Sequence, residues 1–105
     1  MLFHITTREQ WERARAAGTY APPSLATEGF IHLSYARQWP GAANRFYRGR
    51  SGLVLLAIDP ARLGDAVRDE LADGDMFPHL YAALDVGAVV EVRELAVGAD
   101  GGFTG

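Results

Sequence analysis

The run LVLLAI, residues 53–58, is the feature that most limits how this chain can fold. Six consecutive apolar residues followed by the turn signal Asp59-Pro60 have the length of one strand. A strand with no polar side chain must be covered on both of its faces. The run is far shorter than the roughly 20 apolar residues that cross a membrane. The sequence therefore predicts a buried central strand and no association with a membrane.

Short strands and two helices are predicted on either side of this run. A capping box at Thr6 or Thr7 begins the first helix, and Gly18 ends it. The second helix lies within 36–48, and Pro40 moves its start nearer to 39, because proline is tolerated in the first helical turn. The predicted strands are 2–6, 30–34, 53–59, an edge strand at 66–71, and 88–97.

Prolines and glycines mark the segments where regular structure is not expected. Pro22 and Pro23 exclude a helix and predict an extended loop. Pro78 argues against an interior strand position for 77–84. The tail 98–105 is expected to be loose. In the last strand, Val90 and Val92 alternate with Glu91 and Arg93, which are expected to face outward.

The order strand, helix, strand, helix, then several strands predicts an α+β fold. The expected architecture is two helices packed beside a curved mixed or mainly antiparallel sheet. A chain of 105 residues is long enough for one domain, 1–105, and too short for two.

The net charge of -3 and the absence of cysteine exclude several classes of function. Nucleic acid is not expected as a partner, since bulk electrostatics would not hold it. Without cysteine there is no disulfide, thiolate metal site or thiol nucleophile. The start, MLFHITTREQW, has no signal-peptide pattern, so a cytoplasmic location is expected. The oligomeric state stays open.

All three histidines lie inside apolar, strand-like segments. Side chains alternate between the two faces of a strand, so His4 shares a face with Thr6, and His32 shares a face with Ser34. If the two strands are neighbours, both imidazoles reach one patch. His79, in FPHLY, has the same setting. A shared pocket explains all three positions at once.

The histidine positions are also compatible with two other arrangements. In the first, each ring is separately buried and bonded to a backbone carbonyl, as buried polar groups usually are. In the second, three neutral imidazoles hold zinc and leave its fourth position free. No two histidines have the short spacing typical of zinc ligands, so no metal is expected.

A compact group of arginines is the second candidate feature. Arg45 and Arg48 share one side of the second predicted helix, and Arg50 follows it. Guanidinium groups bind phosphate through paired hydrogen bonds. Basic residues at a helix C-terminus also complement the helix dipole without any ligand. Tyr81 flanks His79 and is a candidate for stacking on a base or ring.

The segments FHITTREQWERARAAGTYAPPSLATEGFIHLS, ANRFYRGRSGLVLLAIDPARL and FPHLYAAL together resemble the bacterial family of domains of unknown function numbered 952. The likeness covers nearly the whole chain. Members of that family are small, stand-alone cytoplasmic proteins without an established activity, so the resemblance implies a size and a location but no reaction.

The order and spacing of HIT, Trp11, the Gly-Thr-Tyr segment, IHLS and LVLLAIDPARL are also similar to the NAD-using RNA 2′-phosphotransferases. Those enzymes belong to the ADP-ribosyltransferase superfamily. The resemblance implies a fold of that type, with His4 at the nicotinamide-side ribose. It also implies His32 and an arginine, Arg45 or Arg48, near the phosphates of NAD or of an acceptor.

The sequence departs from that superfamily at its catalytic glutamate. Many members place this residue on a late strand, where it stabilises positive charge developing on the ribose. The corresponding region here has His79, with Glu70 and Asp75 as the nearest acids. The phosphotransferases manage without the glutamate by using basic residues around a phosphate. This sequence also lacks their separate RNA-binding domain.

The leading hypothesis is a cleft that binds NAD or another phosphorylated nucleotide and transfers ADP-ribose. The expected catalytic residues are His4, His32 and His79, and the expected cofactor contacts are Thr6, Ser34, Arg45, Arg48 and Tyr81. The alternative is a non-catalytic ligand-binding or interaction domain, which the missing glutamate favours.

Overall fold

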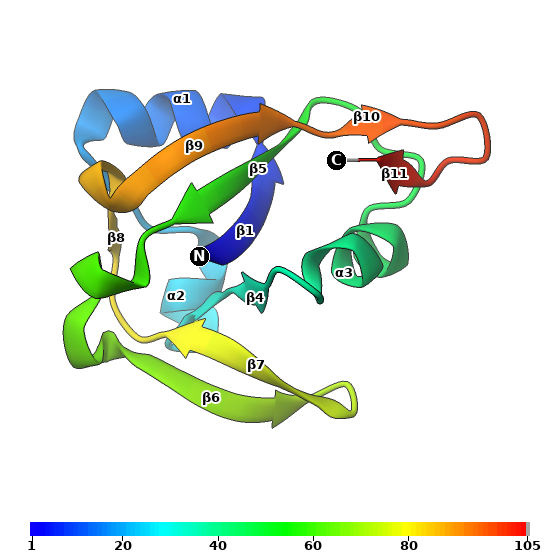
Figure 1. Ribbon diagram of the computed structural model, residues 1–105. Helices are drawn as coiled ribbons and strands as arrows, with labels where there is room; N and C mark the ends of the chain where they lie inside the picture. Colours follow the sequence, from blue (N-terminus) through cyan, green and yellow to red (C-terminus); the bar gives the residue numbers. More distant parts are fainter. Residues whose placement is uncertain (105) are drawn as a thin grey trace.

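The computed structural model describes residues 1–104 and has an α+β fold (Figure 1). The helices are α1 Arg8–Ala17, α2 Pro23–Thr27 and α3 Trp39–Phe46. The strands are β1 Leu2–Thr7, β2 Thr19–Tyr20, β3 Ile31–His32, β4 Ser34–Tyr35, β5 Leu53–Ile58, β6 Val67–Ala72, β7 Asp75–Leu80, β8 Leu84–Asp85, β9 Val89–Glu94, β10 Ala96–Val97 and β11 Phe103–Thr104. Short 3-10 turns occupy Pro60–Arg62, Gly64–Ala66 and Val86–Ala88.

The strands form several small antiparallel sheets in place of the one curved sheet that was expected. The largest has the order β4-β1-β5-β9, and a second has the order β3-β7-β6. Two further pairs, β2-β8 and β10-β11, complete the pairing within the described residues. The β6-β7 hairpin lies below the main sheet in Figure 1, and the β10-β11 pair extends away from it.

Strand β5 confirms the prediction of a buried central strand, because all six of its residues are buried. Its alternating side chains divide the interior into two clusters. Val54, Leu56 and Ile58 pack in the cluster that contains Trp11 of α1. The other three pack in the cluster that contains Trp39 of α3. The two predicted helices therefore cover opposite faces of the strand that most constrains the fold.

The boundaries of α1 follow the sequence signals closely. The hydroxyl of Thr7 accepts a hydrogen bond from the backbone N–H of Gln10 at 3.0 Å, which satisfies one of the free donors at the helix start. Gly18 closes the helix with φ 84°, a left-handed conformation that glycine adopts without strain. The predicted helix is confirmed, and Trp11 and Ala14 are its buried residues.

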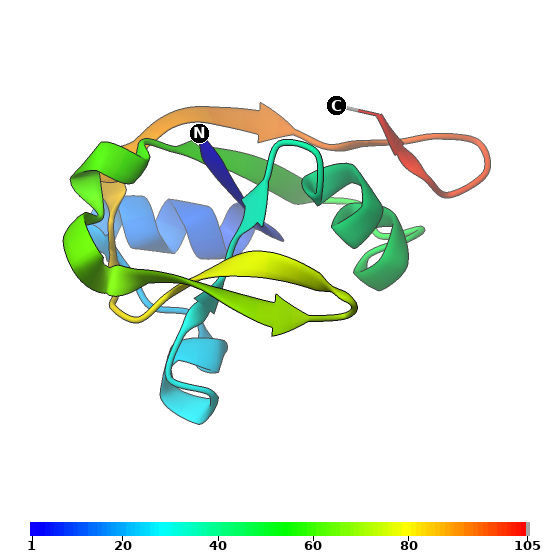
Figure 2. The same ribbon diagram turned by 60° about the horizontal axis from the view of Figure 1, so that its bottom comes forward.

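The prediction of an extended loop at Pro22 and Pro23 is wrong. Pro23 begins the short helix α2, where its missing N–H costs nothing because the first helical N–H groups have no intrahelical partner. Figure 2 shows α2 projecting away from the sheets. The helix brings the chain to Phe30 and then to β3.

The predicted strand 30–34 is divided between two sheets. Strand β3 pairs with β7, whereas β4 pairs with β1. The change occurs at Leu33, whose N–H donates to the carbonyl of Pro78 at 3.0 Å. Pro78 itself lies inside β7, so the expectation that it excludes an interior strand is wrong. The last residue pair between β3 and β7 is His32 with His79. The next pair would require a backbone N–H on Pro78, which proline lacks.

The C-terminal region differs from expectation in two ways. Val90 and Val92 are 54% and 37% exposed, so the predicted inward face of β9 is wrong. A register shift between Ala57 and Ile58 interrupts the pairing of β5 with β9 close to Val90. The tail also contains β11, in which Phe103 is buried. The described part of the tail is thus ordered by pairing with β10, while Gly105 lies outside the described residues.

No helix within residues 1–104 combines the length and the apolar character needed to cross a bilayer.

Candidate functional site

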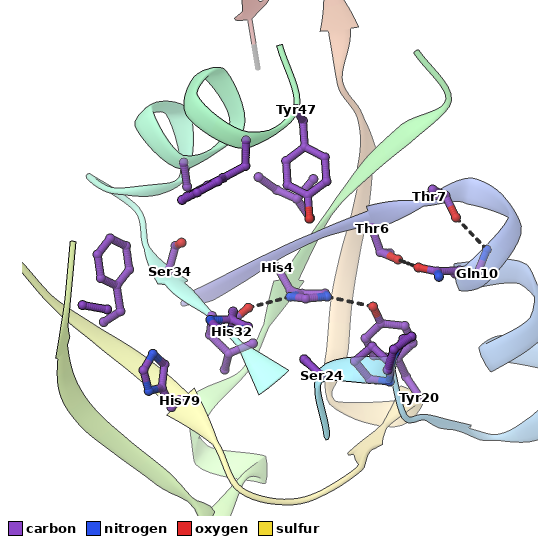
Figure 3. Close-up of a pocket in the computed structure, with 18 of the residues that line it drawn as sticks. His4, Thr6, Thr7, Gln10, Tyr20, Ser24, His32, Ser34, Tyr47 and His79 are labelled. Carbon is purple, nitrogen blue, oxygen red and sulfur yellow. Dashed lines mark hydrogen bonds between the residues drawn. The ribbon is translucent and has the colours of Figure 1, made fainter. Parts of the chain in front are cut away.

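A cavity of about 710 Å³ lies where β1, the β3-β4 segment, α3 and the β6-β7 hairpin meet, and its wall includes all three histidines (Figure 3). Pockets of a few hundred to 1,000 Å³ are typical of small-molecule sites. We refer to it as the histidine cavity. Its wall also contains Thr6, Thr7, Gln10, Tyr20, Ser24, Ser34, Phe46, Tyr47, Arg50, Asp73 and Phe77.

Strand pairing explains why the histidines meet. His32 of β3 is directly opposite His79 of β7, and their ring centroids are 5.5 Å apart. Pairing of β1 with β4 brings His4 beside the backbone of His32. Thr6 and Ser34 line the same cavity, as the alternation of the two strands predicts. The shared pocket expected from the sequence is therefore present, whereas the roles assigned to its residues stay predictions.

His4 is held by hydrogen bonds at both of its ring nitrogens. Its Nδ1 lies 2.6 Å from the carbonyl oxygen of His32, and its Nε2 lies 2.8 Å from the hydroxyl of Tyr20. A carbonyl can only accept, so Nδ1 carries the proton and Nε2 accepts from the tyrosine. Burial lowers the pKa of His4 from 6.5 to about 4. His4 is thus a neutral ring that joins two cavity walls.

Tyr20 occupies the end of the cavity beside α1. It is 4% exposed, and burial raises the pKa of its hydroxyl to about 12. Nearby, the hydroxyl of Thr6 donates to the side-chain oxygen of Gln10 at 2.6 Å. This leaves the amide N–H₂ of Gln10 as a hydrogen-bond donor at the cavity wall. The end formed by these residues is polar, uncharged and partly aromatic.

His32 and His79 are each bonded to a glutamate. Nε2 of His32 is 2.8 Å from Glu28, and Nδ1 of His79 is 2.9 Å from Glu70. The two rings differ in exposure, because the side chain of His32 is 53% exposed and that of His79 is 6% exposed. Nε2 of His79 is buried and has no hydrogen-bond partner among residues 1–104.

Aromatic rings surround the buried histidine. Phe30 stacks on the His79 ring with centroids 4.0 Å apart and an interplanar angle of 14°. Tyr81 donates a hydrogen bond to Glu70. The bonds from Tyr81 and then from His79 lower the pKa of Glu70, so this carboxylate stays ionised. Phe30 and Glu70 together fix the orientation of the His79 ring.

The structure does not bring Arg45, Arg48 or Tyr81 to the cavity wall. Arg45 forms an ion pair with Asp73 at 3.4 Å, and Arg48 donates to the backbone carbonyl of Asp100 at 2.8 Å. Tyr81 donates a hydrogen bond to Glu70, the carboxylate that is also bonded to His79. Helical spacing predicted that the two arginines share one side of the helix, but α3 ends at Phe46, so Arg48 lies beyond it in the following turn.

Arg50 is the arginine that lines the cavity, and it lies after the end of α3. Its guanidinium group is 5.2 Å from the ring centroid of Tyr47, another cavity residue. A guanidinium group held against an aromatic face binds an anion without losing that contact. Sequence reasoning identified Arg50 as a member of the arginine group but did not choose it as a binding residue.

Sequence reasoning also missed the two glutamates as histidine partners. Glu28 precedes His32 by four residues, so the spacing of this acid and this histidine was a signal available in the sequence. Glu70 meets His79 through the β6-β7 hairpin, in which Glu70 and Phe77 are opposite. That contact depends on the hairpin register, which the Asp73-Gly74 turn sets.

No group of three or more His, Asp or Glu side chains within the described residues is arranged to hold a metal ion. Both nitrogens of His4 are already hydrogen-bonded, so this ring has no nitrogen left for a metal, and only one nitrogen each of His32 and His79 is free. The arrangement instead suits an organic ligand with aromatic and polar groups.

Residues 5–92 match the model of the family described as "Protein of unknown function (DUF952)". The chain belongs to the DUF952 family. The matched range includes every residue of the cavity wall except His4, which lies one position before it. No curated protein matches the chain.

Solved structures of another protein, CC0527 from Caulobacter crescentus, are similar to this DUF952 chain. Its crystal structure is 35% identical, covers 98% of this chain and 92% of its own, and has a TM-score of 0.91. Its solution NMR structure is 36% identical, with coverage of 96% and 89% and a TM-score of 0.85. These likenesses establish the family and the α+β fold. The ADP-ribosyltransferase-like fold stays a prediction.

Proposed function

We propose that this DUF952 chain binds NAD or a related phosphorylated nucleotide in the histidine cavity and transfers ADP-ribose from it. The observation that carries the proposal is the meeting of His4, His32 and His79 with Arg50 around one cavity. Histidines gathered from three separate segments, beside a guanidinium cation, are typical of a site that orients a polar, anionic ligand.

The wall of the cavity supports a nucleotide in particular. Tyr47 and Phe77 supply aromatic surface for a base or a nicotinamide ring. Arg50 supplies the paired donors that phosphate oxygens accept. Ser34 and Gln10 supply uncharged hydrogen-bonding groups for ribose hydroxyls. The overall charge of -3 does not attract an anion, so binding would depend on these local groups.

A second candidate is a domain that binds the same ligand without turning it over. The observation that favours it is the shortage of free carboxylates at the cavity. Asp73 is the one carboxylate in the described wall, and it is paired with Arg45. Glu28 and Glu70 are both bonded to histidines. A carboxylate that stabilises positive charge on a ribose is therefore not free in this arrangement.

Titration of the ¹⁵N-labelled chain with NAD tests the binding proposal. We expect saturable chemical-shift changes at the backbone amides of Thr6, Ser34 and Arg50, with small changes at Arg93 of β9, which does not line the cavity. The Arg48→Ala variant is the matched control, because it removes a neighbouring arginine that bonds to Asp100 and does not line the cavity. Unchanged spectra at millimolar NAD would exclude nucleotide binding in this cavity.

Release of free nicotinamide separates the two candidates. With an active transferase, nicotinamide accumulates when the chain is incubated with NAD, and accumulation stops in His32→Ala. With the binding domain, NAD is recovered intact although the amide shifts saturate. Chromatography of the reaction mixture measures both species in one experiment.

A further inference from the structure

The buried ring nitrogen of His79 is the polar atom that the fold leaves without a partner. The side chain is 6% exposed, and Nε2 bonds to no group among residues 1–104. Buried polar atoms in folded proteins are nearly always hydrogen-bonded, so each exception requires a physical reason. Because His79 lines the histidine cavity, the partner that suits this nitrogen is an atom of the ligand.

The hydrogen bond to Glu70 decides what Nε2 can do. A carboxylate accepts hydrogen bonds, so Nδ1 of His79 carries the proton that faces Glu70 at 2.9 Å. In the neutral ring the other nitrogen, Nε2, then has a free lone pair. Phe30, stacked at 4.0 Å, prevents the ring from turning away. A base oriented by a carboxylate through its far nitrogen is the arrangement that general-base catalysis uses.

Neither of the other histidines has a buried ring nitrogen with a free lone pair. Both nitrogens of His4 are occupied, by the carbonyl of His32 and the hydroxyl of Tyr20. His32 donates to Glu28 through Nε2, but its side chain is 53% exposed, so water competes for its free nitrogen. His79 combines a fixed ring, an ionised partner and a protected lone pair.

We propose that Nε2 of His79 is the general base of the reaction, and that the group it activates is a hydroxyl, from water or an alcohol. This inference rests on the proposed binding of NAD and names the class of acceptor. A phosphate acceptor already has an ionised oxygen at neutral pH, so its attack needs no base. A base with a free lone pair has a role only if the attacking oxygen carries hydrogen.

In the proposed step, the hydroxyl oxygen forms a bond to C1′ of the ribose next to nicotinamide, and the bond between C1′ and the nicotinamide nitrogen breaks. Its electron pair stays with that nitrogen, so the cationic ring leaves as neutral nicotinamide. The hydroxyl proton passes to Nε2 of His79 and then to solvent. Glu70 is a positioning residue, which stabilises the imidazolium formed in this step.

Two variants test the proposal with NAD and water as the reactants. His79→Gln is expected to lower the rate of nicotinamide and ADP-ribose release by at least about 100-fold, while the dissociation constant of NAD changes less than about threefold. Glu70→Gln is expected to lower kcat by about tenfold with KM unchanged, because it disturbs the base and not the binding. Asp69→Asn, on the same strand but outside the cavity wall, is the control and keeps the wild-type rate.

The outcomes distinguish this inference from the proposed function. If NAD does not bind, both are overturned. If NAD binds but His79→Gln releases nicotinamide at the wild-type rate, only this inference is overturned. If NAD binds but the wild-type chain releases none, the transfer of ADP-ribose is overturned with it and the binding domain remains. Reaction in phosphate buffer that yields ADP-ribose 1″-phosphate in place of ADP-ribose also overturns it.

A measurement that needs no ligand gives a second test. Long-range ¹H–¹⁵N correlation spectra of the ¹⁵N-labelled chain distinguish the two tautomers of a neutral imidazole. We expect the proton of His79 to be on Nδ1 in the wild-type chain. In Glu70→Gln we expect a mixture of the two tautomers. A proton on Nε2 in the wild-type chain would remove the lone pair on which the proposal depends. Far-UV circular dichroism establishes that each variant is folded.

Discussion

The carbonyl oxygen of His32 lies 2.6 Å from Nδ1 of His4, so the backbone that carries one cavity histidine holds the ring of another. The bond fixes His4 as a neutral imidazole, since its second nitrogen accepts from Tyr20. Two segments separated by α1 and α2 are thereby joined at the cavity wall. His4 is suited to positioning and, with both nitrogens occupied, is not free to exchange protons with a ligand.

Stability should depend on pH through His4. In the unfolded chain its pKa is 6.5, and burial lowers it to about 4 in the folded chain. Between these values the unfolded state binds more protons, so the free energy of unfolding falls as the pH drops from 6.5 toward 4 and is unaffected by His4 above that window. The difference amounts to about 3 kcal/mol at most. Urea unfolding at several pH values measures it.

The matched variant for this prediction is His4→Gln, whose amide can both donate and accept but does not titrate. Its free energy of unfolding should fall less steeply than that of the wild-type chain over the same pH range. Equal slopes in the two chains, or an NMR titration of His4 with a midpoint near 6.5, would contradict the assignment.

Arg50, and not Arg48, should control the affinity for an anionic ligand. Arg50 lines the cavity, whereas Arg48 bonds to Asp100, and neither of these two residues lines it. Loss of a charge-assisted hydrogen bond costs about 1.5–3 kcal/mol, so Arg50→Ala should weaken NAD binding roughly ten- to a hundredfold. Arg48→Ala should change it less than about twofold. Isothermal titration calorimetry measures both, and a larger loss in Arg48→Ala would refute the assignment.

Local rules were sufficient for the parts of the site that lie within one element. Alternation along a strand placed His4 and Thr6 on one face, and the capping signals gave the bounds of α1. A continuous apolar run identified β5 as the central strand. These features depend on residues close in sequence, so the sequence carries them directly.

The remaining features depend on contacts between distant segments. The division of residues 30–34 between two sheets requires the carbonyl of Pro78 as a partner for Leu33. Alternation told which residues of β9 share a face, but not that Val90 and Val92 are exposed. The pairing of Glu70 with His79 requires the hairpin register. The Leu33 and β9 contacts join segments distant in sequence, so no local pattern contains them, whereas the register of the β6-β7 hairpin is set by its own Asp73-Gly74 turn.

Two glycine substitutions should change stability in opposite directions. Gly74 has φ 80° in the turn of the β6-β7 hairpin, a conformation that costs other residues about 1–2 kcal/mol. Gly74→Ala should therefore destabilise the chain by about 1 kcal/mol. Gly41 lies in α3, where an added Cβ meets nothing within 4 Å, so Gly41→Ala should stabilise it by about 0.5 kcal/mol.

The same pair of variants separates backbone strain from general sensitivity to substitution. Each exchanges glycine for alanine at a position with free space around the new methyl group. Chemical denaturation with identical slopes for both variants gives the two free energies directly. Equal destabilisation by both would argue against the left-handed turn that sets the register of Glu70 with His79.

Removal of the Tyr20 hydroxyl should cost more than removal of an exposed tyrosine hydroxyl. Tyr20→Phe leaves Nε2 of His4 without its donor in a buried setting, which is expected to lower the free energy of unfolding by about 1–2 kcal/mol. Tyr35→Phe is the control, because the Tyr35 hydroxyl bonds to the exposed carboxylate of Asp69. In this variant water can replace the lost hydrogen bond to Asp69. Its cost should stay under about 0.5 kcal/mol. A Tyr20→Phe variant as stable as the control would mean that the bond between Tyr20 and His4 does not hold the cavity together in solution.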